Sequence, residues 1–384
     1  MIKKFNIEKT RQLKRINKIL SLFYRKSNYT AEIKFREARN ILIVDFALMG
    51  DMIMDIPFLK TIRHNCPKAH ITMVAMQWAE IILGDQKLVD EFIIFDGKNI
   101  LSSPKSILKN RKIIRKILDK INLKTYEIGF EPKGDFRHIW FMHNTKSMRT
   151  VSYNYTGGEY LITDSFVPKE STKHLIDEKL DLLEMCGMRI YNEDCVPQLL
   201  LSKSSKIFVE KYLDENDLNG KRIIGIHPGA SNNNKQYKGY PELVKKMGRF
   251  LKENDMFCVF EGPEESKIVD AVCDEIKLSR RPYVRVKVKT KEYVILVYIC
   301  DYMICNDSAA GHIAAAYGIP VTIIFGPVSS DVALPRGRGK INYISHNLSC
   351  KPCTLPECPE KTEKCISEIG AEEVLEKILE LMEV

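Results

Sequence analysis

The stretch Ile41-Leu42-Ile43-Val44-Asp45-Phe46-Ala47-Leu48-Met49-Gly50-Asp51 decides the fold of this 384-residue chain. Its first four residues form a short apolar, β-branched run bounded by the turn-like Leu48–Asp51, which is typical of a buried strand. A helical pattern follows, with Pro57 in its first turns. A strand that leads through a turn into a helix is the repeating unit of a parallel α/β sheet.

The same alternation continues along the chain in two series. The first series has further strands at 70–75, 93–95 and 128–131, and a helix over 107–121 with a basic outer face. A break near Leu199–Ser205 precedes a second series, with strands at 222–226, 256–260, 283–286, 302–305 and 320–325. This pattern predicts an α/β protein with two domains and a cleft between them, residues 40–200 and 201–384, with ligands at the carboxyl ends of the strands.

Composition and charge exclude several classes of protein. Hydrophobic residues make up 45% and charged residues 28%, which is typical of a globular chain. No apolar run reaches the roughly 18–20 residues of a membrane span. The N-terminus is too charged for a signal peptide, which favours a cytoplasmic protein. Nucleic-acid binding is not predicted, because no basic platform interleaved with aromatic residues is present.

The net charge of +9 is concentrated in the leader, residues 1–39. Residues 1–40 hold 12 Lys and Arg against 3 Asp and Glu, and the remainder holds 47 of each sign. Leu13, Ile16, Ile19, Leu20 and Phe23 recur at helical spacing between basic residues. A basic amphipathic helix of this kind suits an anionic membrane surface, so the protein is expected to be peripheral on the inner face of the cytoplasmic membrane. The alternative is a helix that packs on the body of the protein or on a partner subunit.

Residues with chemical potential follow the strands. Gly50 permits a tight turn, and Asp51 after it either caps a helix or serves as a general base. The loop His227–Ser231 and the following Lys235 suit a diphosphate, although a plain surface loop has the same composition. Glu261–Glu265 contains acidic residues that either bind a ribose or form a solvated turn. Asn306–His312 runs into a helix start, which is a ready anion site.

These motifs, in this order, resemble the heptosyltransferase family of bacterial glycosyltransferases, which use ADP-heptose to build the lipopolysaccharide core. Ile41–Asp51 is similar to the family's first strand and turn, and Tyr126–Arg137 to its central strand and basic turn. Ile226–Ser231 with Lys235, and Asn306–His312 with the following alanine-rich helix, complete the resemblance, which covers residues 40–380.

The resemblance implies a GT-B fold, in which two Rossmann-like domains face a central cleft, with the acceptor on residues 40–200 and the nucleotide sugar on 201–384. It implies inverting, metal-independent transfer, with Asp51 as the base and Lys235 on the leaving diphosphate. The residues implied for the sugar donor are Gly50, Ser231, Lys235, Glu264, Glu265, Asp307, Ser308, Ala309, Gly311 and His312. Three positions depart from the family pattern: Ala309 stands in place of Gly, Gln236-Tyr237 in place of a Lys-x-Trp pairing, and Asp45 in place of a basic or small residue.

Four of the eleven cysteines lie within the segment 350–365. Cys350, Cys353, Cys358 and Cys365 have a spacing that suits a tetrahedral zinc or iron site. Protein-directed heptosyltransferases of the family hold an iron in this way, which implies a structural metal that the chemistry does not require. The alternatives are reduced thiols or a local disulfide.

Two alternatives to lipopolysaccharide core transfer remain open at this point. The leader and the cysteine cluster favour a heptosyltransferase-like enzyme that glycosylates a protein or a capsule precursor. Ala309, which adds a methyl group beside the expected phosphates, favours a nucleotide-sugar-binding protein without turnover.

Overall fold

The computed structural model describes residues 17, 34–168, 173–353, 355 and 357–382, and divides into two compact units. The first unit extends to Cys195 and the second begins at Val196. The leader helix predicted from the sequence lies outside the described residues, apart from Asn17. The side chain of Asn17 accepts a hydrogen bond from the backbone N–H of Gly158 at 2.7 Å and donates one to Glu159.

The N-terminal unit is a six-stranded parallel sheet with the order β3-β2-β1-β4-β5-β6. Its strands are β1 (Asn40–Asp45), β2 (His70–Ala75), β3 (Glu91–Ile94), β4 (Tyr126–Glu131), β5 (Ser147–Tyr153) and β6 (Asp164–Phe166). Its α-helices are α2 (Met49–Ile53), α3 (Ile56–Asn65), α4 (Trp78–Leu83), α5 (Gly97–Ile100), α6 (Pro104–Lys109), α7 (Arg111–Ile121), α8 (Phe136–His143) and α9 (Leu175–Met185). The central strand β1 is buried from Ile41 to Asp45, as its apolar run predicts.

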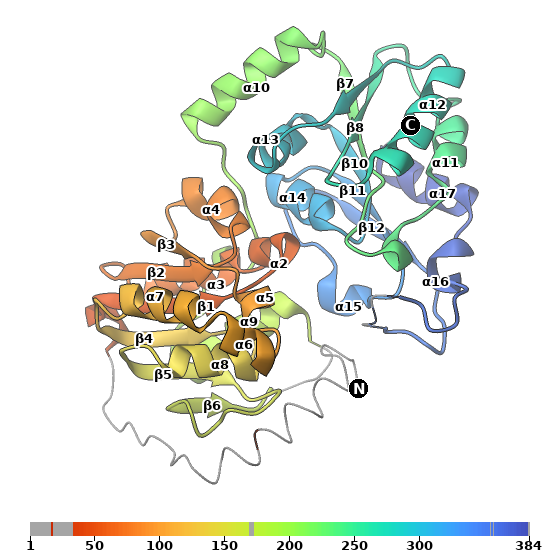
Figure 1. Cartoon of the computed structure of the whole chain (residues 1–384). Helices are drawn as coiled ribbons and strands as arrows, with labels where there is room; N and C mark the ends of the chain where they lie inside the picture. The colour runs from red at the N-terminus through yellow and green to blue at the C-terminus, as the bar shows by residue number, and fades with distance from the viewer. Residues whose placement is uncertain (1–16, 18–33, 169–172, 354, 356, 383–384) are drawn as a thin grey trace. The chain divides into compact units, whose positions relative to one another are not determined.

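The C-terminal unit repeats this topology in the order β12-β11-β10-β7-β8-β9. Its strands are β7 (Arg222–His227), β8 (Asp255–Phe260), β9 (Tyr283–Val286), β10 (Tyr302–Asn306), β11 (Val321–Phe325) and β12 (Ile341–Ser345). Its α-helices are α10 (Lys203–Glu215), α11 (Tyr240–Met247), α12 (Ser266–Leu278), α13 (Thr290–Leu296), α14 (Ala309–Tyr317), α15 (Ser330–Ala333), α16 (Lys364–Ser367) and α17 (Ala371–Met382). Figure 1 shows helices on both faces of each sheet.

In both units the first and fourth strands are neighbours at the centre of the sheet. The second and third strands extend the sheet from the first strand toward one edge, and the fifth and sixth extend it from the fourth strand toward the other. This strand order is that of a Rossmann fold, whose ligands bind at the point where the order reverses. The predicted α/β class and the two Rossmann-like halves are confirmed. Among the described residues, no helix is long and apolar enough to cross a membrane.

Two helices expected from the sequence are each divided. The pattern after β1 forms α2 and α3, and Gly50 lies inside α2 rather than at a turn. The segment 107–121 forms α6 and α7, which meet at Asn110. Both the backbone N–H and the side-chain amide of Asn110 donate to the carbonyl of Ser106, and the backbone of Asn110, with φ of -101° and ψ of 14°, is not helical.

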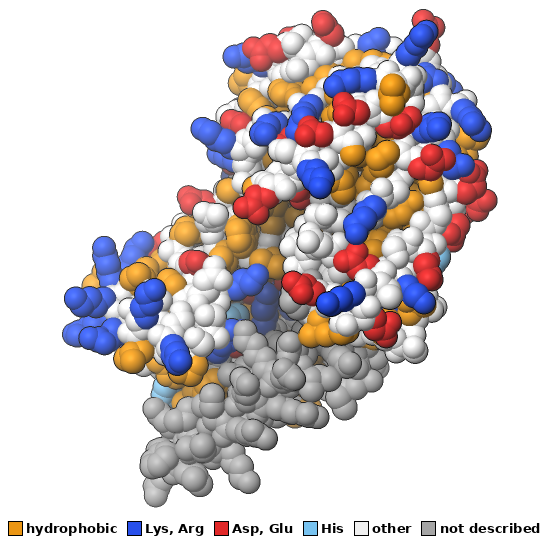
Figure 2. All heavy atoms as spheres, turned by 45° about the vertical axis from the view of Figure 1, so that its right-hand side comes forward, with side chains coloured by type: hydrophobic (Ala, Val, Ile, Leu, Met, Phe, Trp, Pro, Cys, Tyr) orange, Lys and Arg blue, Asp and Glu red, His pale blue; other side chains and the backbone are white. Residues whose placement is uncertain are grey.

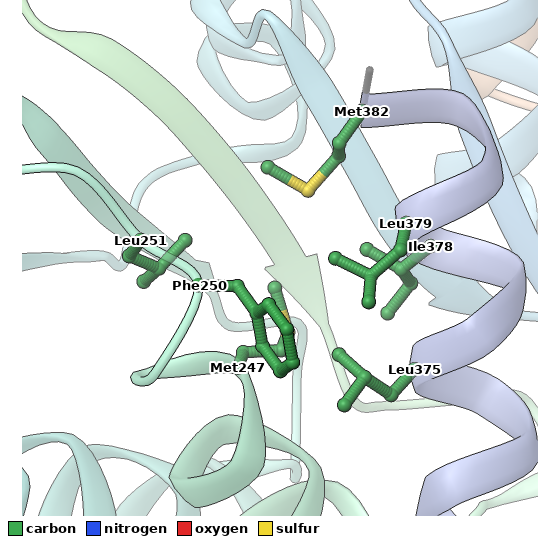
Figure 3. A pocket seen from close by; sticks show the side chains of 7 residues that line it. All are labelled: Met247, Phe250, Leu251, Leu375, Ile378, Leu379 and Met382. Atoms are coloured by element: carbon green, nitrogen blue, oxygen red, sulfur yellow. The ribbon is translucent and has the colours of Figure 1, made fainter. Parts of the chain in front are cut away.

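The C-terminal helix α17 closes one side of its unit by packing on α11. Leu375 and Ile378 of α17 are buried against the core of this unit. A shallow apolar depression lies beside them, and Figure 3 shows the side chains that line it. Its lining is Met247, Phe250, Leu251, Leu375, Ile378, Leu379 and Met382, so it offers no polar group to a nucleotide sugar.

Candidate active site

The carboxyl ends of β7 and β10 form the centre of the candidate sugar-donor site. The register places Cys305 opposite His227, so Asn306 and Asp307 follow β10 level with the His227–Ser231 loop. Asn306 is fully buried, and its amide nitrogen donates to the carbonyls of Pro228 at 2.7 Å and Gly229 at 3.0 Å. Its oxygen accepts from the backbone N–H of Tyr237. Asn306 therefore fixes the loop on both sides of Lys235.

Lys235 and Asp307 form an ion pair at this edge. The Lys235 ammonium lies 2.6 Å from the Asp307 carboxylate, and the Asp307 side chain is only 8% exposed. Lys235 is held in place in this way, yet an ammonium has three hydrogen-bond donors. It can keep its bond to Asp307 and still donate to a phosphate oxygen. The two residues predicted from separate motifs are therefore brought together.

The start of α14 completes the anion-binding geometry. Ser308 is the N-cap residue and its side chain makes no capping hydrogen bond to the helix, while Ala309 is the first helical residue. The free N–H groups of a helix N-terminus attract anions. Gly311 lets α14 approach β10, because a Cβ there would come within 3.1 Å of the Cys305 sulfur. His312 is buried in the same turn.

The acidic residues that follow β8 differ in burial and in hydrogen-bond partners. Glu261 is buried, and bonds to Ser266, Arg285 and Lys287 satisfy its carboxylate. Burial opposes its ionisation, but these partners lower its pKa to about 2. Glu261 is thus already used by the fold and is not a free ligand for a ribose.

Of the two expected candidates, Glu265 is the one beside the His227–Ser231 loop. A Cβ on Gly229 would overlap the Glu265 carboxylate, and the backbone N–H of Gly262 donates to it at 2.7 Å. Burial raises the pKa of Glu265 and lowers the pKa of the neighbouring His227 to about 4. Glu264 is exposed and has a left-handed backbone with φ of 64°.

The remaining residues of the loop differ in exposure. Ser231 is exposed, whereas Tyr237 is only 3% exposed and packs edge-on against Tyr240. Tyr237, noted as a departure from the family pattern, is therefore a core residue in this chain.

In the N-terminal unit, Asp51 lies in the first turn of α2 and forms an ion pair with Lys133. The Lys133 ammonium is 3.4 Å from the Asp51 carboxylate and 3.5 Å from that of Asp45, and Asp51 is 37% exposed. Burial acts to lower the pKa of Lys133, but the two carboxylates outweigh it and raise that pKa. Only an ionised carboxylate forms an ion pair, and that is the form able to accept a proton.

Behind this pair lies a buried charge cluster, which we define as Asp45, Asp55, Lys133 and Lys179. Lys179 of α9 lies 3.3 Å from Asp45 and also contacts Asp55, and all three side chains are at most 6% exposed. Burial opposes ionisation of Asp45, but Lys133 and Lys179 lower its pKa to about 2. Burial and the charge of Asp45 raise the pKa of Asp55 to about 8. Together with Asp51, the cluster brings three carboxyl groups to two ammonium groups, and the raised pKa of Asp55 makes it the carboxyl that takes up a proton most readily.

The sequence predicts Asp51, Lys235 and Asp307 as site residues but not most of the side chains that hold them in place. The sequence predicts Asn306 only as part of the Asn306–His312 motif and gives no prediction for Lys179 or Asp55. The available signal for Lys179 was its position on the apolar face of a helix, one turn from Ile176 and Leu183.

The four clustered cysteines are not gathered as metal ligands. Among the described residues, no three His, Cys, Asp or Glu side chains are arranged to hold a metal ion. Backbone N–H groups of Glu363, Thr362 and Glu360 donate to the Cys358 sulfur and lower its pKa, which favours a thiolate. Burial raises the pKa of Cys365, which lies at the start of α16. Cysteine thiolates are suitable ligands for a soft metal such as zinc or iron, but the four sulfur atoms are not arranged around a common point in this structure.

Comparison with known proteins identifies relatives that match most of the chain. The family model described as glycosyltransferase family 9 (heptosyltransferase) matches residues 114–364. Lipooligosaccharide heptosyltransferase 2 of Campylobacter jejuni is 28% identical over 341 residues, covering 87% of this chain and 95% of the relative.

Two solved structures are similar in fold. That of Escherichia coli ADP-heptose lipopolysaccharide heptosyltransferase II has a TM-score of 0.70 at 20% identity, covering 89% of this chain and 98% of that one. That of an iron-containing dodecameric glycosyltransferase from enterotoxigenic Escherichia coli has a TM-score of 0.55 at 12% identity, covering 94% of this chain and 81% of that one.

Proposed function

The chain belongs to glycosyltransferase family 9, the heptosyltransferases, and from this premise we propose that it transfers heptose from ADP-heptose to the lipopolysaccharide core. The observation that carries the proposal is the Lys235–Asp307 ion pair at the ends of β7 and β10, beside the free N-terminus of α14. The choice of acceptor and sugar donor is supported by the relatives, which are named as a lipooligosaccharide heptosyltransferase and an ADP-heptose lipopolysaccharide heptosyltransferase.

The proposed reaction inverts the configuration at the anomeric carbon. An acceptor hydroxyl attacks from the face opposite the diphosphate and loses its proton to Asp51. Lys235 and the N–H groups at the start of α14 stabilise the negative charge of the departing nucleotide diphosphate. These fixed groups do the work that a divalent ion does in other glycosyltransferases, so no metal takes part in a step.

A panel of nucleotide sugars tests this function. We expect calorimetric titration to give the tightest binding for ADP-heptose, compared with GDP- and UDP-sugars, because the family's sugar donor is an adenine nucleotide. Incubation with a lipopolysaccharide core acceptor should then yield a product heavier by one heptose. Tighter binding of a GDP- or UDP-sugar would contradict the proposed sugar donor, and transfer only to a polypeptide or a capsule precursor would favour the alternative acceptors.

A structural metal held by Cys350, Cys353, Cys358 and Cys365 is a second part of the proposal. Its first support is the C-x₂-C spacing. The backbone N–H groups that lower the pKa of Cys358, and the iron in a protein of similar fold, are the others. Because the four sulfurs are not gathered in this structure, binding would have to draw the segment 350–365 together around the ion.

Elemental analysis decides whether this metal is present. Protein purified without chelator or metal-affinity resin is expected to contain about one iron or zinc per chain, since one tetrahedral site uses all four thiolates. Iron would add charge-transfer absorption and zinc would not. A metal content near zero, with four titratable thiols in this segment, would rule the site out.

The leader, residues 1–39, is proposed to anchor the enzyme on the inner face of the cytoplasmic membrane. The support is the sequence itself, in which nearly all the net charge and a helical apolar stripe fall in this segment.

A further inference from the structure

A second basic region lies on the surface of the N-terminal unit, well away from the leader in sequence. We define the α6–α7 surface as the exposed side chains of residues 97–124. This segment contains nine Lys and Arg residues and a single acidic one, Asp119, although residues 41–384 as a whole carry equal numbers of each charge. The positive charge of the body of the protein is therefore concentrated locally on α6 and α7.

Most of these cations form no ion pair within the fold. Within the described residues, ion pairs in this segment are limited to Arg115 with Asp119, at 3.9 Å and well exposed, and Lys124 with Glu91. Lys120 adds a weaker electrostatic interaction with Glu91. The other exposed cations of α6 and α7 form no ion pair with a described acidic residue; they are Lys105, Lys109, Arg111, Lys112 and Lys116. Unpaired charge of one sign repels itself, so its concentration here costs stability unless an anion covers it.

Large aliphatic side chains stand out among these cations. Leu108 is 65% exposed, Ile113 is 48% exposed and Leu123 is 84% exposed, whereas Ile114 and Ile121 on the inner face of α7 are buried. The helix thus has an apolar inner face that packs on the core and additional apolar groups directed to solvent. Figure 2 shows Lys and Arg side chains gathered with hydrophobic ones on the N-terminal unit.

We propose that the α6–α7 surface docks on an anionic lipid bilayer. Lysine and arginine side chains at this surface would lie at the lipid phosphates, and the exposed Leu and Ile side chains would enter the boundary between headgroups and acyl chains. A single-stranded nucleic acid fits less well, because residues 97–124 contain no aromatic side chain on which a base can stack. The proposal rests on the charge and the exposed side chains of residues 97–124, and it does not depend on which acceptor the enzyme uses.

A tryptophan reporter locates the contact in the full-length protein. Leu108→Trp is expected to be quenched by lipids brominated in the acyl chain, in vesicles of phosphatidylcholine and phosphatidylglycerol mixed at about two to one. The matched control is Ile207→Trp on α10, which replaces an equally exposed side chain outside the α6–α7 surface and should not be quenched. This readout separates the α6–α7 surface from the leader, which is unchanged in both variants.

Paired charge reversals test the electrostatic part. Lys112→Glu with Lys116→Glu is expected to weaken vesicle binding by at least about 25-fold, since each lost cation is worth about fivefold. The control Lys206→Glu with Lys211→Glu changes the net charge of the chain equally from α10 and should have little effect. Binding should also weaken as salt rises from about 50 to about 500 mM. Transfer to a water-soluble, deacylated acceptor should be the same in all variants, so a failed function and a failed docking surface give different results.

Three outcomes would overturn the proposal. The first is a tryptophan at position 108 that is not quenched in protein bound to vesicles. The second is equal vesicle binding by the two charge-reversal pairs. The third is that the variant with Lys112→Glu and Lys116→Glu loses binding of an RNA oligonucleotide but keeps its binding to vesicles.

Discussion

Replacing Asp51 with Asn is expected to lower turnover by about 10² or more and to leave the affinity for the nucleotide sugar nearly unchanged. The amide keeps the size of the side chain but cannot accept the acceptor's proton. Asp51 lies in the N-terminal unit, whereas the ion pair proposed to hold the diphosphate lies in the C-terminal unit. Steady-state kinetics and calorimetric titration of the same preparation measure the two effects.

Two further variants serve as controls for the Asp51→Asn result. Asp119→Asn alters an exposed aspartate on α7 of the same unit and should turn over normally. Lys235→Met should instead weaken binding of the nucleotide sugar, because it removes the cation proposed to lie on the phosphates. Near-normal turnover in Asp51→Asn would leave Asp51 the role of a carboxylate that stabilises the first turn of α2, which its position also permits.

The clearest sequence signals belong to strands that are buried on both faces, although the edge strands β3 and β9, which are only partly buried, are also predicted. β1, β2, β7 and β11 are nearly continuous apolar runs, because helices cover both sides of a parallel sheet. The strands that the sequence did not predict, β5, β6 and β12, contain exposed or half-buried positions and polar residues. β6 and β12 are edge strands, so they need no continuous apolar run.

Some residues of the candidate site can be predicted from a short sequence motif, whereas others depend on partners that are distant in the sequence. Lys235 and Asp307 are found because each follows a strand within a short motif, and the strand order then brings the two motifs together. The support for Asp51 depends on distant partners instead. Lys179 is separated from Asp45 by 134 residues, and no local pattern indicates that α9 delivers its ammonium beneath β1. Periodicity assigns a face to such a residue but not a partner.

The buried charge cluster leads to the second large effect. Replacing Lys179 with Met is expected to lower the free energy of unfolding by about 3–5 kcal/mol, the cost of removing one partner from a buried ion pair. The control Lys173→Met, just before the same helix, breaks a partly exposed pair with Asp181 and should cost at most about 1 kcal/mol. Hydrogen exchange of the β1 and β4 amides follows the N-terminal unit alone, which matters because a two-unit chain need not unfold in one step.

The same cluster predicts how stability depends on pH. The pKa of Asp55 in the folded protein, about 8, lies above its value of about 3.9 in the unfolded chain, so folding takes up a proton between these values. The stability that this proton contributes is fully present below about pH 4 and is lost as pH rises towards about 8, at up to about 1.4 kcal/mol per pH unit.

Asp55→Asn isolates this effect, because the amide mimics the protonated acid and cannot ionise. We expect the variant to be close to wild type in stability at low pH and to lose the slope between about pH 5 and 8, leaving it the more stable of the two at alkaline pH. Asp45 acts in the opposite direction. Its pKa is lowered to about 2, so its contribution is present above about pH 4 and is lost only as the solution becomes more acidic. A wild-type slope in Asp55→Asn, together with equal stability of Lys179→Met and Lys173→Met, would show that the cluster is not the source of either effect.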